Sequence, residues 1–288
     1  MDAPHTSLCM IVRNEQHNLP ECLRSMRDLI AEVVIVDTGS SDQTKIIAAS
    51  YGARVFDFPW RHDFAAARNE SLRRASGEWI FWLDADERID PINRKKLRVL
   101  FRNLRRTQVV YSMRCDTFAR GTPAVAYHPR LFRSDSGGRW QYRVHETLDW
   151  PASTRPPVVQ TDIAIQHIGY REEQISAEKN HRNLHLLEME IQERPNDVHV
   201  LLHLARGYIG AGRFAEAVVL LEKCLKLAPV GSAYHLWTFY SLLQSCVHLS
   251  KWELALHYCV EGLKFFPNDP LLSSDGQKLA KKISSSPV

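Results

Sequence analysis

The sequence predicts an α/β domain with a mostly parallel sheet, followed by an all-α region. In the first half, short runs of β-branched and aromatic residues alternate with segments whose apolar residues recur at helical spacing. This alternation is typical of a parallel sheet with helices on both faces. After Tyr170 only helical patterns remain. We therefore expect two domains, over residues 1–171 and 172–288.

Three of the expected strands end in polar clusters. "RNE" follows the first strand, "DTGSSD" follows the second and "DAD" follows the fourth. Ligands of open parallel sheets bind beyond the carboxyl ends of the strands, so we expect the three clusters to converge on one crevice. The four strands are expected at Ser7–Val12, Glu32–Asp37, Ala53–Phe58 and Trp79–Asp84.

The segment after the fourth strand has two parts. Residues 94–106, "RKKLRVLFRNLRR", form a basic amphipathic helix, for which a solvated surface face is the first interpretation and a membrane-surface or phosphate-binding role the second. Residues 107–167 are strand-like and irregular, with several Gly and Pro clusters. We interpret them as the rest of the same domain.

The helical region contains an internal repeat. Ala217 and Ala255 lie 38 residues apart, as do Pro229 and Pro267. A helical hairpin with a small residue at its crossing and a closing proline resembles the tetratricopeptide repeat. About two repeats fit, and solenoids need roughly three units for stability. We therefore expect these helices to dock on the first domain or on a partner, with simple local helix packing as the alternative.

Composition limits the classes of function. Hydrophobic residues make up 44% and charged residues 24% of the chain, as in ordinary globular proteins. The net charge of +4 is too small to indicate nucleic-acid binding but suits an anionic substrate. The six scattered cysteines indicate reduced thiols, and the first residues lack the pattern of a signal peptide. We expect a cytoplasmic protein, and the basic helix leaves open a peripheral location at the inner face of the membrane.

The stretch "VDTGSSDQT" predicts a ligand-binding turn. Asp37 closes a strand, and Thr-Gly-Ser-Ser-Asp then opens a helix, so that backbone N–H groups gather near a helix amino terminus. Helix capping alone would explain Ser41 or Asp42 but not Asp37. The chain has neither G-x-G-x-x-G nor G-x-x-x-x-G-K-[ST], which disfavours dinucleotide and P-loop binding.

The stretch "DAD" predicts a metal site. In an extended chain Asp84 and Asp86 point to the same side, so both carboxylates can face one cation. Hard oxygen ligands suit Mg²⁺ or Mn²⁺, which commonly join carboxylates to substrate phosphates. Two acids at a strand end are often just a solvated turn, but the other polar strand ends favour the metal.

Two later motifs add candidate residues. Glu146 of "RVHETL" has the chemistry of a general base, and His167 of "IQHIGY" that of a metal ligand or a diphosphate contact. Arg68 and Asn69 lie on the helix before the fourth strand, where an ordinary exposed face is the simpler interpretation. An isolated histidine is also more often structural than functional.

Taken in order, these motifs resemble the family 2 inverting glycosyltransferases, which have the GT-A fold. The matching stretches are "MIVRNEQHNLPECLRSM", "EVVIVDTGSSDQT", "FAAARNESLRRASGEWIFWLDADE", "HPRLFR…VHETL" and "HIGY", within residues 7–170. The last two are similar to a subgroup that includes lipopolysaccharide-core glucosyltransferases and peptide glycosyltransferases with helical carboxyl-terminal repeats.

The resemblance implies a role for each matching residue. Asp86 would bind the metal with His167 as a late metal or diphosphate ligand, and Glu146 would be the base. The family often has a Glu-Asp pair there, which "VHE" lacks, so Asp149 is the fallback. Arg13, Asn14 and Glu15 would line the nucleotide pocket, where Asp37 would contact the base or ribose and Asp42 would belong to the same loop. Arg68 and Asn69 would face the donor. Asp84 would lie near the donor sugar and ribose and would also be catalytic.

The expected function is metal-dependent, inverting transfer of a sugar from a nucleotide-diphospho-sugar. The resemblance implies Mn²⁺ or Mg²⁺, a UDP-sugar donor, and a saccharide, lipid-linked or peptide acceptor. The repeats suggest a protein partner or a homo-oligomer. Two alternatives remain: a tetratricopeptide-type scaffold with a degenerate GT-A domain, and a sugar-phosphate nucleotidyltransferase. The latter usually has a Gly-rich loop after its first strand, where this chain has "RNEQHN".

Overall fold

The computed structural model describes residues 5–119, 122–168 and 173–285. The chain divides into two compact units, Met1–Ser176 and Ala177–Val288, which we describe separately. The domain boundary expected after residue 171 and the last two residues of the "HIGY" motif lie outside the described residues.

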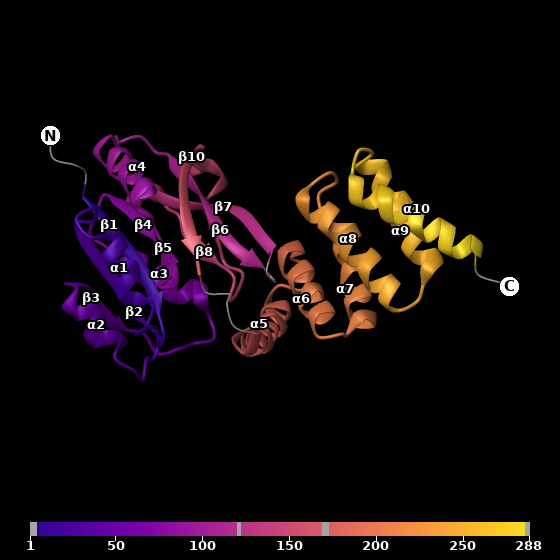
Figure 1. The fold of residues 1–288 in the computed structure, drawn as a ribbon, viewed down its shortest axis with the longest axis horizontal. Helices are drawn as coiled ribbons and strands as arrows, with labels where there is room; N and C mark the ends of the chain where they lie inside the picture. The colour runs from indigo at the N-terminus through magenta and orange to yellow at the C-terminus, as the bar shows by residue number, and fades with distance from the viewer. Residues whose placement is uncertain (1–4, 120–121, 169–172, 286–288) are drawn as a thin grey trace. The chain divides into compact units, whose positions relative to one another are not determined.

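The first unit is built on an eight-stranded sheet with the order β3-β2-β1-β4-β7-β6-β10-β5 (Figure 1). β1 pairs in parallel with β2 and β4, and β2 pairs in parallel with β3. The carboxyl ends of these strands therefore meet at one edge, where the polar clusters lie. These strands are β1 (Thr6–Val12), β2 (Glu32–Asp37), β3 (Arg54–Asp57) and β4 (Trp79–Trp82).

The other half of the sheet comes mainly from the irregular segment. β7 pairs antiparallel with both β4 and β6, β10 runs parallel to β6, and β5 runs antiparallel to β10. The β5–β10 register places Glu87 opposite His167. The predicted α/β unit with a mostly parallel sheet is confirmed. These strands are β5 (Glu87–Arg88), β6 (Val110–Ala119), β7 (Thr122–Arg133) and β10 (Val158–His167).

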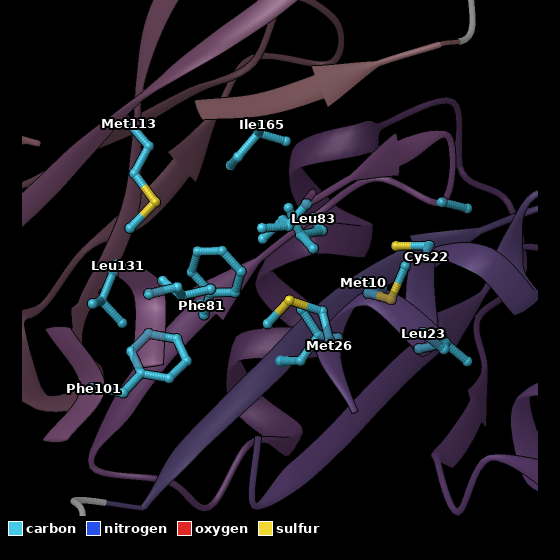
Figure 2. Close-up of a cluster of buried hydrophobic side chains, with 14 of the residues drawn as sticks. Met10, Cys22, Leu23, Met26, Phe81, Leu83, Phe101, Met113, Leu131 and Ile165 are labelled. Carbon is cyan, nitrogen blue, oxygen red and sulfur yellow. The ribbon is translucent and has the colours of Figure 1, made fainter. Parts of the chain in front are cut away.

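One face of the sheet carries the larger hydrophobic core. Side chains alternate across a strand, so Met10 and Phe81 point to this face and meet Met26 and Phe101 from two helices (Figure 2). The rings of Phe81 and Phe101 pack edge to face with centroids 5.7 Å apart. The helices of this face are α1 (Leu19–Met26), α2 (Thr44–Ser50) and α4 (Pro91–Arg102).

The opposite face carries a smaller core with several tryptophans. Trp82 points to this side and packs edge to face against Trp140, with ring centroids 5.0 Å apart. Helix α3 also packs here, and Asp63 caps it by accepting from Ala66 N at 2.8 Å. The elements of this side are α3 (Phe64–Arg74), the two-stranded sheet of β8 (Arg139–Gln141) and β9 (Thr147–Asp149), and two short 3₁₀ turns, Ser134–Ser136 and Ala152–Thr154.

The second unit is a series of antiparallel helices. Ala217 and Ala255, the small residues of the predicted repeat, are fully buried, which lets neighbouring helices approach closely. The arrangement is consistent with tetratricopeptide-like repeats. In the described part of the chain, no helix combines the length and hydropathy needed to span a bilayer. The helices are α5 (Glu173–Glu193), α6 (Val198–Gly210), α7 (Phe214–Leu227), α8 (Ala233–His248), α9 (Trp252–Phe265) and α10 (Pro270–Ser285).

Truncation of Phe81 tests the core of the first unit. Phe81 is fully buried and packs against Phe101, so we expect Phe81→Ala to lower the free energy of unfolding by about 3–5 kcal/mol through lost burial and a cavity. Equilibrium urea unfolding measures the change. Ile92→Ala is the control, because that side chain is exposed and its loss should change stability by less than about 0.5 kcal/mol. Equal effects of the two variants would contradict the described core.

Candidate active site

The loops after β1 and β2 are joined by hydrogen bonds. Asn14, at φ 55°, donates its N–H to Ser40 Oγ at 2.9 Å and accepts from Ser41 N at 2.8 Å through Oδ1. Glu15 N donates to Thr44 Oγ1 at 2.7 Å. The "RNE" and "DTGSSD" clusters therefore form one continuous polar edge, as expected from adjacent parallel strands.

Asp37 lies at the centre of this edge. Its carboxylate is buried, and Oδ1 accepts from Gly39 N at 3.0 Å and from Ser40 N at 2.8 Å. Gly39 has φ 108°, which only glycine adopts readily. Within the described part of the chain, the buried Oδ2 has no hydrogen-bond partner. Buried polar atoms are normally satisfied, so Oδ2 is an acceptor available to a ligand.

Asp42 and Arg13 lie on the same two loops. Asp42 accepts from Thr44 N at 3.0 Å and from Gln16 N at 3.2 Å, and so ties the loops together. Burial raises the pKa of this carboxyl, but the hydrogen bonds from Thr44 and Gln16 outweigh it and lower the pKa. Arg13 is exposed on the loop after β1. The geometry thus gives Asp42 a role in loop structure.

Arg68 connects two of the candidate carboxylates. Its guanidinium donates from Nη2 to Asp84 Oδ1 at 2.8 Å and from Nε to Glu146 Oε1 at 2.7 Å. The guanidinium also lies near the rings of Trp82 and Trp140, 4.8 and 4.9 Å from their centroids. Arg68 is only 8% exposed, so these contacts fix its side chain in a buried position. The exposed helical face considered from the sequence is wrong for Arg68.

Asp84 lies among charges of both signs. Burial raises the pKa of its carboxyl, Arg68 and Arg130 lower it, and Glu87 and Asp86 raise it again. The net direction is upward. A further positive group at this place, such as a metal ion, would favour the ionised form of the Asp84 carboxyl.

Asn69 follows Arg68 on α3 but takes part in a different contact. Its amide nitrogen donates to Trp140 O at 2.9 Å, and its amide oxygen accepts from Trp140 N at 2.9 Å. Both ends of the amide therefore hold β8 in place. This contact positions the Trp140 ring that packs against Arg68.

Asp86 and His167 come together from distant parts of the chain. Asp86 Oδ2 lies 3.2 Å from His167 Nε2, and Ile168 N donates to Asp86 O at 3.0 Å. Two neighbouring ligands of an octahedral ion, each about 2.1 Å from it, lie about 3 Å apart. The Asp86–His167 pair therefore has a donor set and spacing that fit a divalent cation. Burial lowers the pKa of His167, but hydrogen bonds to Asp86, Cys115 and Glu87 raise it to about 12, so a bound cation would have to displace the proton from His167 Nε2.

Glu87 is a site residue that was not predicted from the sequence. Its buried carboxylate accepts from Arg130 Nη2 at 2.6 Å and Nη1 at 2.7 Å, and from Asp84 N at 2.9 Å. Burial raises the pKa of Glu87, but the charge and hydrogen bonds of Arg130, together with hydrogen bonds from His167 and Asp84 N, lower it by more. Glu87 Oε1 is also 3.7 Å from His167 Nδ1. The sequence signal that could have identified this pair is Glu87, the third acid of "DADE", together with Arg130, the arginine of "HPRLF".

Glu87, Cys115 and His167 also gather ligand atoms within 4.8 Å of one another. Glu87 is already paired with Arg130, and Cys115 is buried. The Asp86 side of His167 is therefore the better candidate for a cation site. The fallback base, Asp149, lies at the end of β9 and is half exposed in an ion pair with Arg155 at 2.5 Å.

A family model and several known proteins are similar in sequence to this chain. The model of glycosyl transferase family 2 matches residues 7–155. A TPR repeat-containing protein of Synechococcus elongatus is 30% identical over 76% of this chain and 56% of its own length. The SPbeta prophage-derived glycosyltransferase SunS of Bacillus subtilis is 26% identical over 78% of this chain and 54% of its own length. The chain thus spans about half the length of these relatives.

A solved structure agrees with the fold. Residues 1–349 of S. aureus TarS superpose with a TM-score of 0.51 at 15% identity, covering 90% of this chain and 91% of that one. At this identity the likeness concerns the fold alone. The family model covers more than half of the sequence and contains the strand ends described above. The chain therefore belongs to glycosyl transferase family 2.

Proposed function

We propose that this protein is a metal-dependent, inverting glycosyltransferase that uses a nucleotide-diphospho-sugar donor, with UDP as the expected nucleotide. The proposal rests on one observation, the arrangement of side chains around the short turn Asp84–Asp86. Asp86 pairs with His167, and this pair is suited to bind a cation. Asp84 is joined through Arg68 to Glu146, which is suited to act as a base. Family membership and the TarS structure with UDP-GlcNAc support the choice of donor.

The nucleotide would lie along the edge formed by the first two loops. The unsatisfied Oδ2 of Asp37 accepts a hydrogen bond from the base or the ribose, and Asn14 and Glu15 shape the wall beside it. Arg13 is exposed on the same loop, where its charge complements the diphosphate. Asp84 would then lie near the ribose and the donor sugar, beside the diphosphate.

The leaving group would lie beside Asp86 and His167. These residues would hold Mn²⁺ or Mg²⁺, which when bound stabilises the negative charge left on the departing diphosphate. On the other side, Glu146 accepts the proton of the acceptor group as that group attacks the anomeric carbon. The bond from carbon to diphosphate oxygen breaks as the new bond forms, so attack from the opposite face inverts the configuration. Arg68 holds the Glu146 carboxylate for this step.

The acceptor, the partner and the location belong to the proposal as well. A saccharide, a lipid-linked saccharide and a peptide all supply a nucleophile that Glu146 can deprotonate. We propose that the helical unit binds a protein partner or a second copy of the chain, and that the chain is cytoplasmic.

Loss of a metal ligand should stop transfer. We expect Asp86→Ala to abolish sugar transfer. We expect His167→Ala to weaken Mn²⁺ binding by more than about 10-fold, because even loss of an outer-shell partner lowers affinity about 10–100-fold. Calorimetry measures Mn²⁺ affinity, and UDP release from a panel of UDP-sugars measures turnover. His257→Ala, an exposed position of the second unit, is the control. Unchanged Mn²⁺ affinity in both site variants would contradict the metal assignment.

Loss of the base should affect turnover and not donor binding. Glu146→Gln keeps the shape of the side chain but cannot take a proton, so we expect kcat to fall about 10²–10⁴-fold with the affinity for UDP little changed. Steady-state kinetics and UDP titration separate the two quantities. Asp149→Asn should remain active, because Asp149 is half exposed and paired with Arg155. The reverse pattern would identify Asp149 as the base.

Arg68 can be tested as a positioning residue. Arg68→Lys keeps the charge but cannot bridge two carboxylates with a planar fork. We expect kcat to fall about 100-fold, the typical result of misplacing a catalytic group by about 1 Å, with the KM for the donor little changed. A large rise in KM at unchanged kcat would show instead that Arg68 binds the donor directly.

A further inference from the structure

The outer side of helix α4 carries a group of cations that the proposed function does not use. We define the α4 basic face as Lys95, Arg98, Arg102, Arg105 and Arg106, all exposed. Three of these residues lie on the helix, and Arg105 and Arg106 lie three and four residues after its last residue, Arg102.

The packing of α4 fixes which way this face points. Leu97 and Phe101 are buried in the core of the first unit, and Asp90 caps the helix by accepting from Ile92 N and Asn93 N. At 100° per residue, positions 92, 95, 98, 99 and 102 fall on one stripe opposite the buried side chains. The exposed stripe is therefore fixed by the fold.

Within the described residues, no acidic side chain neutralises the positive charge of this face. Residues 91–106 contain no Asp or Glu. At the flanks, Lys96 pairs with Asp162 at 2.7 Å, and Arg94 donates to the carbonyls of Arg24 and Ser25. Among the residues that the structure describes, none of the five cations of the α4 basic face forms an ion pair. Their combined charge is therefore available to an anionic surface.

Two large aliphatic side chains share the same stripe. Ile92 is 69% exposed and Val99 is 61% exposed. Val99 lies between Arg98 and Arg102 along the stripe. A solvated or nucleic-acid-binding face gains nothing from exposed aliphatic groups. An anionic bilayer accommodates both kinds of side chain, because cations meet the headgroups while aliphatic groups enter the acyl boundary.

We propose that the α4 basic face, together with Ile92 and Val99, binds the surface of an anionic lipid bilayer. The charges draw the protein to the headgroups, and the two aliphatic side chains add a contact that free phosphate or another polyanion does not offer. The helix lies along the surface, because the stripe runs the length of α4. This proposal is independent of the proposed glycosyl transfer, since none of these residues lies in the candidate active site.

Vesicle binding by the full chain tests the proposal. We expect cosedimentation with vesicles of equimolar phosphatidylglycerol and phosphatidylcholine, loss of binding at high salt, and no binding to pure phosphatidylcholine. The triple change R98E/R102E/R106E should weaken binding at least about 100-fold, because each cation near an anionic surface contributes about fivefold. The control K226E/K251E/K281E makes the same charge change at exposed positions of the second unit and should bind like the unchanged chain.

A second variant separates a membrane from other polyanions. Ile92→Ser with Val99→Ser keeps every charge, so we expect weaker vesicle binding and unchanged binding to a short RNA duplex. Thermal unfolding of each variant confirms that it folds. Absence of vesicle binding by the unchanged chain, equal loss in both triple variants, or competition by inorganic phosphate would overturn the proposal. Tighter binding to the RNA duplex than to vesicles would overturn it in favour of a nucleic-acid surface.

Discussion

The candidate site depends on the buried ion pair between Glu87 and Arg130. Both carboxylate oxygens accept from the guanidinium, at 2.6 and 2.7 Å, and one also accepts from Asp84 N. The guanidinium carbon of Arg130 lies 3.7 Å from the centroid of the ring of Trp82, the last residue of the strand that precedes Asp84 and Asp86. Removing one partner of such a pair leaves a buried charge and costs about 3–5 kcal/mol. Glu87 thus fixes the turn from which Asp84 and Asp86 project, and its strand brings His167 alongside.

Around this support the charges separate into two groups with different chemistry. In the proposed site, Asp86 and His167 would form the cation side, where negative charge on a leaving group can be stabilised. Arg68, held near two tryptophan rings, forms the other side and keeps Glu146 next to Asp84. Because these charged side chains are already held in place, they need to move little when a charged donor binds. Such preorganisation of charges is what makes electrostatic catalysis effective.

The sequence predicted the fold well because its signals are local. Alternating strands and helices, and the polar cluster after each strand, follow from patterns within ten residues, and the structure confirms the α/β unit and the helical region. The contacts inside the site were harder to predict from the sequence. Arg68 and Glu146 are 78 residues apart and Glu87 and Arg130 are 43 apart, so only the register of the sheet reveals these pairs. For the same reason Asn69 could not be predicted to hold Trp140 through both ends of its amide.

The most direct measurement is a crystal structure of the full chain with Mn²⁺ and UDP, with data collected near the manganese absorption edge. We expect an anomalous peak within coordination distance of Asp86 Oδ2 and His167 Nε2, and a hydrogen bond from the nucleotide to Asp37 Oδ2. Glu146 should stay on the opposite side of Asp84, bridged by Arg68. A manganese peak away from both Asp86 and His167, in crystals of enzyme that transfers sugar, would contradict the account.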